Sequence, residues 1–155
     1  MATVQALVLF AHGARDPRWA DPFEAVAERI RAAAPDLPVV LAYLELMAPT
    51  LEAAVAGVVA DGATTVDIVP LFLGTGGHLR QDLPPLVDAL RSAHPDVTIR
   101  LHAAIGEHAA VSAAMAHAAL VAAGVGERPA RPYSIAQRTS TSSGSFRRRS
   151  AATST

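Results

Sequence analysis

Apolar runs alternate with segments of helical periodicity across the first 126 residues. Each run is rich in β-branched or other apolar residues and predicts a buried parallel strand, and apolar positions at helical spacing follow it. The predicted strands are Val4–Ala11, Val39–Leu44, Val66–Phe72 and Val97–Leu101. The predicted helices are Pro22–Ala34, Leu51–Ala60, Gln81–Ala93 and His108–Ala123. Four strand–helix units in series indicate an α/β fold, with an open parallel four-stranded sheet and helices on both faces.

Residues that favour helix ends flank these segments. Asp21, with Glu24 three residues later, predicts a capped start for the first helix, and Thr50 predicts the cap of the second. Gly124 ends the last helix. The stretch Gly74-Thr75-Gly76-Gly77 predicts a loop before the third helix.

Composition and charge change sharply after residue 126. Residues 1–126 carry 7 arginines against 13 acidic residues, whereas residues 127–155 carry 6 arginines, one acidic residue and 11 serines or threonines. We therefore expect an α/β domain over 1–126 and a basic disordered tail over 127–155. Arg147–Arg149 could touch anionic lipid or nucleic acid, but a solvated tail is the expectation, with neither as a partner. The same shift also fits a truncated or frame-shifted gene.

Two missing residue types exclude several classes of chemistry. The chain has no cysteine and no lysine, because all 13 basic residues are arginine. Thiolate metal sites, iron–sulfur clusters, Schiff bases and the Walker-A phosphate lysine are excluded. The apolar run in Met1–Phe10 has no basic residues and is too short to span a bilayer, so we expect a cytoplasmic protein. Histidine, aspartate, glutamate and arginine must supply the chemistry.

Candidate site residues follow the first three predicted strands. His12, Glu45 and His78 stand at carboxyl ends, where open α/β sheets bind ligands. In a 2-1-3-4 strand order, strands one and three are neighbours about 4.8 Å apart. Either histidine alone is more often a solvent-facing side chain, but the pair could bind one metal ion. Gly13 and Gly77 beside them would let a bulky ligand approach the backbone.

The glycine-rich stretch does not predict a nucleotide site. A dinucleotide-binding motif beginning at Gly74 requires glycine where the chain has Leu79, and a P-loop requires lysine. We interpret the stretch as a flat wall without side chains, from which His78 projects.

Four segments together carry a family resemblance: FAHGARDP at 10–17, YLELMAPT at 43–50, LFLGTGGH at 71–78 and DLP at 82–84. They resemble the class II tetrapyrrole chelatases, and most closely the sirohydrochlorin chelatases, which insert cobalt, iron or nickel. The resemblance covers Val4 to Ala123. Ala14 departs from it, since the family usually has serine there.

The resemblance implies a chelatase-like, flavodoxin-like half domain that works without ATP or another nucleotide. His12 and His78 would bind the divalent metal ion and accept pyrrole protons, and Glu45 would orient a group or accept a proton. The implied tetrapyrrole-binding residues are Gly13, Arg15, Gly76, Gly77 and Arg80.

The resemblance also implies a homodimer. Many bacterial members contain two such halves, while short archaeal-type members have one and work as homodimers; the alternative is the N-terminal half of a two-domain form. A tetrapyrrole is a flat disc, and a single half offers one wall, so a second copy would supply the other. We expect exposed apolar residues beside this cleft, at Leu46, Met47, Leu73 and Leu79.

Two other functions fit the same residues. A non-catalytic metal or tetrapyrrole carrier would use the same histidines without turnover. A histidine-dependent phosphoryl-transfer enzyme also has His-Gly after its first strand, but it places an arginine where this chain has Ala11.

The tail carries a first testable prediction. Because residues 127–155 contain few large apolar side chains, deleting Arg128–Thr155 should leave the melting temperature within about 2 °C of the full chain. Thermal unfolding followed by circular dichroism measures it. A fall of more than about 5 °C would show that the tail packs on the domain.

Overall fold

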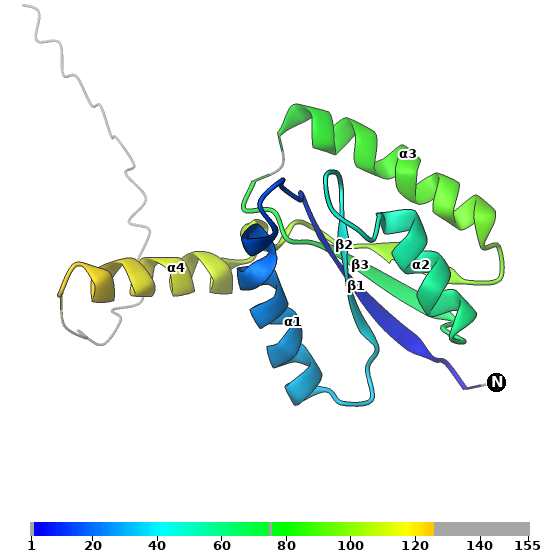
Figure 1. The fold of residues 1–155 in the computed structure, drawn as a ribbon, viewed down its shortest axis with the longest axis horizontal. Coiled ribbons are helices and arrows are strands. Elements are labelled where there is room, and N and C mark those ends of the chain that lie inside the picture. The colour runs from blue at the N-terminus through cyan, green and yellow to red at the C-terminus, as the bar shows by residue number, and fades with distance from the viewer. Residues whose placement is uncertain (1, 75, 126–155) are drawn as a thin grey trace, which may run out of the picture.

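Four parallel strands form one sheet in the order β2-β1-β3-β4 (Figure 1). The computed structural model describes residues 2–74 and 76–125, apart from the side chain of His78. The strands are β1 (Gln5–Ala11), β2 (Val39–Tyr43), β3 (Thr65–Pro70) and β4 (Thr98–Leu101). The predicted fold class and strand order are confirmed. The expected tail over 127–155 lies outside the described residues.

Within the described residues, four α-helices and two short 3-10 helices connect and follow the strands. They are η1 (Pro17–Ala20), α1 (Asp21–Ala33), α2 (Leu51–Ala60), α3 (Gly77–Ala93), η2 (Ile105–Glu107) and α4 (Ala109–Ala122). Figure 1 shows α2 and α3 on one face of the sheet and α1 on the other. No helix in the described ranges is both long and apolar enough to cross a membrane.

The alternation of side chains along each strand builds a separate core on each face. Val8 and Phe10 of β1 point into the core beneath α2 and α3, while Leu9 and Ala11 point into the core beneath α1. Both cores contain buried residues of β1, the strand between β2 and β3. Burial on both faces explains why the strands read as continuous apolar runs.

The structure corrects one predicted helix cap and confirms another. Asp21 is the first residue of α1, and the cap position is Ala20, which makes no side-chain cap. The short helix η1 leads directly into α1, and the side-chain cap stands at the start of η1. There, Asp16 Oδ1 accepts a hydrogen bond from the backbone N–H of Arg18 at 3.0 Å. Thr50 caps α2 as predicted, with Oγ1 accepting from Ala53 N at 3.2 Å.

Helix α3 begins four residues earlier than the sequence pattern predicts. It starts at Gly77, so the prediction that the loop wall extends through Gly77 is wrong, and His78 lies in the first turn of the helix. The misplaced start came from Pro84 and Pro85, which usually stand in a first turn because proline lacks the backbone N–H. Here both lie inside the helix. Leu83 packs in the core on the sheet, and this tertiary burial offsets the hydrogen bonds that the prolines remove.

On the α1 face of the sheet, a buried carboxylate in β3 connects this strand to β1 and β4. Asp67 of β3 is only 5% exposed and accepts hydrogen bonds from Gln5 Nε2 at 2.7 Å and from Arg100 Nε at 2.7 Å. Its Oδ1 also lies 2.6 Å from His102 Nε2. The Arg100 guanidinium is the main cause that lowers the pKa of Asp67 far below its usual value, against the opposing effect of burial.

This cluster predicts a pH-dependent contribution to stability. Because the folded state lowers the pKa of Asp67, the stabilisation is complete above the unfolded value near 3.8 and is lost as the pH falls through the lower folded value. At pH 7, Asp67→Asn should reduce the free energy of unfolding by about 1–3 kcal/mol, measured by urea denaturation.

The matched control is Asp88→Asn. Asp88 is exposed and pairs with Arg91 at 2.9 Å on the surface of α3, so its loss should change stability by less than about 0.5 kcal/mol. Equal effects of the two substitutions would contradict a special role for Asp67.

Candidate functional site

The carboxyl ends of β1 and β2 are joined by backbone hydrogen bonds that continue beyond the strands. His12 directly follows β1, and Glu45 comes two residues after β2. The N–H of Leu44 donates to Ala11 O at 2.8 Å, and the N–H of Glu45 donates to His12 O at 3.0 Å. These bonds hold the backbone of His12 beside that of Glu45, as the sequence predicts for residues at adjacent strand ends.

Gly13 makes this close approach possible. Its φ of +89° lies in the region that glycine favours, and a Cβ there would overlap the carbonyl oxygen of Glu45. Gly13 is therefore required for the contact between the two loops. The sequence predicts that Gly13 lets a ligand approach the backbone closely, and the structure adds this packing role.

The imidazole of His12 rests on a stack of aromatic rings. Its centroid lies 4.5 Å from that of Phe72, with a 50° angle between the planes. Phe72 is buried and packs edge-on against Phe10 at 5.8 Å. This contact fixes the orientation of the half-buried His12 ring at the edge of the sheet.

A hollow of about 280 Å³ opens beside His12. Its walls come from the end of β1, the loop after β2 and one side of α3, with apolar side chains and three polar groups. The lining residues are His12, Leu44, Glu45, Leu79, Asp82, Leu83 and Leu86. An apolar wall with a few convergent polar groups is typical of a site that binds an organic ligand.

Asp82 is a further candidate site residue, and no sequence pattern predicted it. It lies in α3, one turn after His78, and lines the hollow together with His12 and Glu45. A sequence signal for Asp82 did exist. It is the first residue of the DLP segment at 82–84, which is part of the family resemblance but was given no function.

The predicted partner of His12 is described only in its backbone. His78 lies in the first turn of α3, after the loop that follows β3, and its side chain lies outside the described part of the structure. Among the described residues, no group of three or more His, Asp or Glu side chains is arranged to hold a metal ion. The shared His12–His78 metal site therefore stays a prediction.

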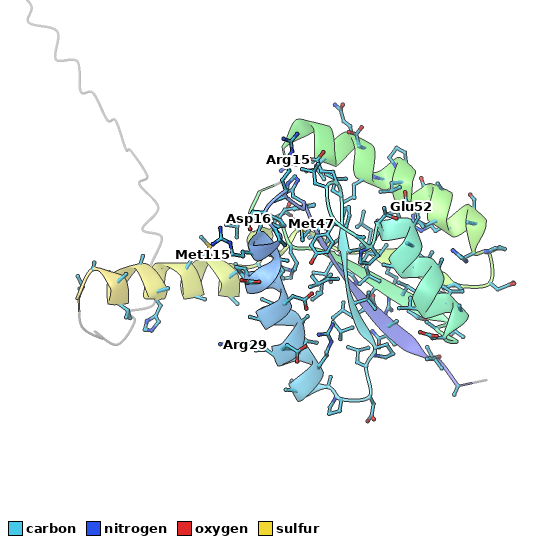
Figure 2. All side chains as sticks on the ribbon, viewed as in Figure 1. Arg15, Asp16, Arg29, Met47, Glu52 and Met115 are labelled. Atoms are coloured by element: carbon cyan, nitrogen blue, oxygen red, sulfur yellow. The ribbon has the colours of Figure 1, made fainter. Side chains whose placement is uncertain are left out.

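The remaining predicted ligand-binding residues surround this edge of the sheet. Gly76 is the cap residue of α3 and Gly77 its first residue, and a Cβ at either would meet open space. Arg15 is exposed at the end of the sheet where β1 stops (Figure 2), while Arg80 lies in the first turn of α3. Arg18, by contrast, pairs with Asp16 at 2.8 Å.

Of the four apolar residues expected to be exposed beside the cleft, the structure leaves two exposed, and of the four only Leu79 lines the hollow. Leu46 is 60% exposed and Leu73 is 63% exposed, while Met47 and Leu79 are half-buried. Leu46 also adopts a φ of +63°, which costs a residue with a side chain about 1–2 kcal/mol. The loop after β2 therefore holds an exposed leucine in a backbone conformation that is unfavourable for a residue with a side chain.

Comparisons with known proteins agree on one family. The CbiX family model matches residues 6–120. A sirohydrochlorin ferrochelatase from Priestia megaterium is 32% identical over 62% of this chain and 36% of its own. A sirohydrochlorin cobaltochelatase from Methanococcus aeolicus is 34% identical over 54% of this chain and 59% of its own. The chain thus spans between about a third and three fifths of the length of these two relatives.

Solved structures show the same similarity. A putative cobalamin biosynthesis CbiX protein from Marinobacter aquaeolei is 33% identical with a TM-score of 0.70, covering 79% of this chain and 99% of that one. The sirohydrochlorin chelatase SirB from Bacillus subtilis in complex with cobalt is 32% identical with a TM-score of 0.63, covering 73% of this chain and 48% of that one.

Gly13 gives the site its own testable prediction. Gly13→Ala should push the His12 and Glu45 loops apart and reduce the free energy of unfolding by about 1–3 kcal/mol, measured by urea denaturation. The control is Gly57→Ala within α2, where a Cβ meets nothing and alanine should stabilise the helix by up to about 1 kcal/mol. Unchanged stability of the Gly13 variant would contradict the close approach.

Proposed function

The chain belongs to the CbiX family of sirohydrochlorin chelatases, and on this basis we propose that it inserts a divalent metal ion into a metal-free tetrapyrrole of the sirohydrochlorin type. The observation that carries the proposal is the placement of His12 and Glu45. Both line an otherwise largely apolar hollow at the carboxyl edge of the sheet, and His12 is held there by Phe72.

The reaction needs a base that works near neutral pH. Inserting a divalent ion releases two protons from the pyrrole nitrogens of the macrocycle. Histidine is the side chain whose ordinary pKa suits this task, and His12 presents its ring at the wall of the hollow. His12 and His78 accept these protons in the proposed reaction. Glu45 orients His12 or carries a proton onward from the same wall.

The metal ion is a substrate and must therefore be held loosely enough to leave. Two imidazoles, from His12 and His78, with water or a carboxylate completing the coordination, hold cobalt, iron or nickel less tightly than thiolates would. Glu45 and Asp82 are the carboxylates that line the hollow with His12. The named relatives include both ferrochelatases and cobaltochelatases, which supports iron or cobalt as the ion.

The hollow supplies one surface for the macrocycle. Leu44, Leu79, Leu83 and Leu86 offer an apolar wall on which a flat ring can stack, and Arg15 and Arg80 lie at the same edge to meet its carboxylates. A disc bound to one wall keeps its other face in water. We therefore propose that the working form is a homodimer in which a second copy covers that face.

Substituting each histidine tests the assignment. His12→Ala and His78→Ala should each reduce the rate of metal insertion at least about 100-fold while the far-ultraviolet circular dichroism stays unchanged, because each removes a ligand and a base. The measurement is the change in absorption of sirohydrochlorin with Co²⁺ or Fe²⁺.

The matched control is His94→Ala, at the opposite end of α3 from the site. It should leave the insertion rate unchanged. Wild-type rates in either site variant would overturn the shared-site assignment. Conversion of no more than one equivalent of tetrapyrrole per protein would instead identify a carrier.

A further inference from the structure

The hollow beside His12 is acidic, although the macrocycle proposed to bind there is itself an anion. Its polar lining consists of His12, Glu45 and Asp82, and among the described residues no arginine lines it. Two carboxylates in a wall that is otherwise mostly apolar attract a cation and repel the carboxylates of a macrocycle. The metal ion is the cation among the two proposed substrates, so the charge of the hollow suits the ion.

Asp82 interrupts an apolar stripe on α3. The residues of α3 that line the hollow follow the i, i+3, i+4 and i+7 spacing of one helix face, and they are Leu79, Asp82, Leu83 and Leu86. A leucine at position 82 would complete the apolar wall and add contact area for a flat ring. A carboxylate in this position therefore indicates that the wall also meets a charged ligand.

The carboxylate of Asp82 has no structural task within its own domain. Asp88, on the same helix, pairs with Arg91 at 2.9 Å. In residues 2–74 and 76–125, by contrast, the side chain of Asp82 forms neither a hydrogen bond nor an ion pair. Its charge is exposed at the wall of the hollow and is available to a ligand there.

Asp82 acts over a longer distance than a coordinating ligand. Within the described part of the chain, no three His, Asp or Glu side chains are arranged to hold one ion, so His12, Glu45 and Asp82 do not coordinate one together. Contact is unnecessary for attraction. A cleft lined by charges of one sign and by apolar walls raises the local concentration of ions of the opposite sign. This effect reaches across about 8 Å at physiological ionic strength.

The positive charges at this edge of the sheet lie outside the hollow. Arg15 is exposed at the end of β1, and Arg80 lies in the first turn of α3. Neither belongs to the lining of the hollow. The carboxylates of the macrocycle are attracted to these arginines, while the divalent cation is attracted to the acidic wall. The same edge thus sorts two substrates of opposite charge.

We propose that Asp82 collects the metal ion for the reaction: together with Glu45 it draws the divalent cation into the hollow and delivers it to His12. Asp82 is a positioning residue, because it acts on the ion through its charge. The bound cation offsets the two carboxylates, so the anionic macrocycle binds more readily after the ion than before it. This inference rests on the proposed function, which supplies the ion as a substrate.

Asp82→Asn tests the inference, because it removes the charge and keeps the shape. In steady-state cobalt insertion, the KM for Co²⁺ should rise at least about threefold, since a charge near the ion is lost. The KM for sirohydrochlorin should not rise, and kcat at saturating Co²⁺ should stay within about twofold. Asp82→Glu, which restores the charge, should keep the KM for Co²⁺ within about twofold of the wild type.

The matched control is Asp88→Asn, which removes a carboxylate from the same helix outside the hollow. It should leave the KM for Co²⁺ unchanged. An unchanged KM for Co²⁺ in Asp82→Asn would overturn the inference. An equal rise in the two asparagine variants would overturn it too, because the effect would then belong to the net charge of the domain.

Ionic strength separates attraction at a distance from direct coordination. The ratio of the KM for Co²⁺ in Asp82→Asn to that in the wild type should fall toward one as a non-coordinating salt rises from about 0.01 M to about 1 M, because the Debye length shrinks about tenfold. A ratio that stays constant over this range would make Asp82 a direct ligand and overturn the proposed role.

Titration with Co²⁺ alone distinguishes a failure of this inference from a failure of the proposed function. Isothermal titration calorimetry without tetrapyrrole should show at least about threefold weaker Co²⁺ binding by Asp82→Asn than by the wild type. Equal Co²⁺ affinities in a protein that inserts metal would overturn the inference and leave the proposed function standing. Weaker binding by the variant of a protein that inserts no metal would support the collecting role and overturn the proposed function alone.

Discussion

The parallel pairing of β1 with both β2 and β3 is the constraint on which the rest of the structure depends. This pairing aligns the carboxyl ends of β1, β2 and β3 at one edge of the sheet. The backbone hydrogen bonds between β1 and β2 continue beyond the strand ends, where the N–H of Glu45 donates to His12 O. Residues 33 positions apart thereby become backbone neighbours. The same pairing explains Gly13, because only a residue without a Cβ fits where the two loops meet.

The strands and their order follow from the sequence because burial on both faces leaves a strong apolar signal. Each predicted strand agrees with the observed one to within two residues at either end. Helix starts were less predictable, since local rules compete with tertiary contacts. Pro84 and Pro85 indicated a late start for α3, while packing of Leu83 on the sheet carries the helix through them.

The sequence likewise predicted only part of the candidate site. Sequence placed His12 and Glu45 at adjacent strand ends, because topology alone determines that proximity. It missed the support of His12 by Phe72 and the presence of Asp82 in the hollow, because both depend on side-chain packing between distant segments. The failure of α4 to cover its own sheet was equally invisible, because an alanine-rich helix reads the same whether it packs on its own domain or on another.

Two largely apolar surfaces of the described domain are left open by its own helices. One is the hollow at the carboxyl edge beside His12, and the other is the groove on the α1 face of the sheet. The solved relatives contain this α/β unit both in a chain that the match covers almost entirely and in a chain about twice as long. Apolar surface must be covered in either setting, since the free energy of burial does not depend on whether a linker joins the units. A linker changes only the effective concentration of the second unit, so in separate chains the contact itself must be strong enough to hold.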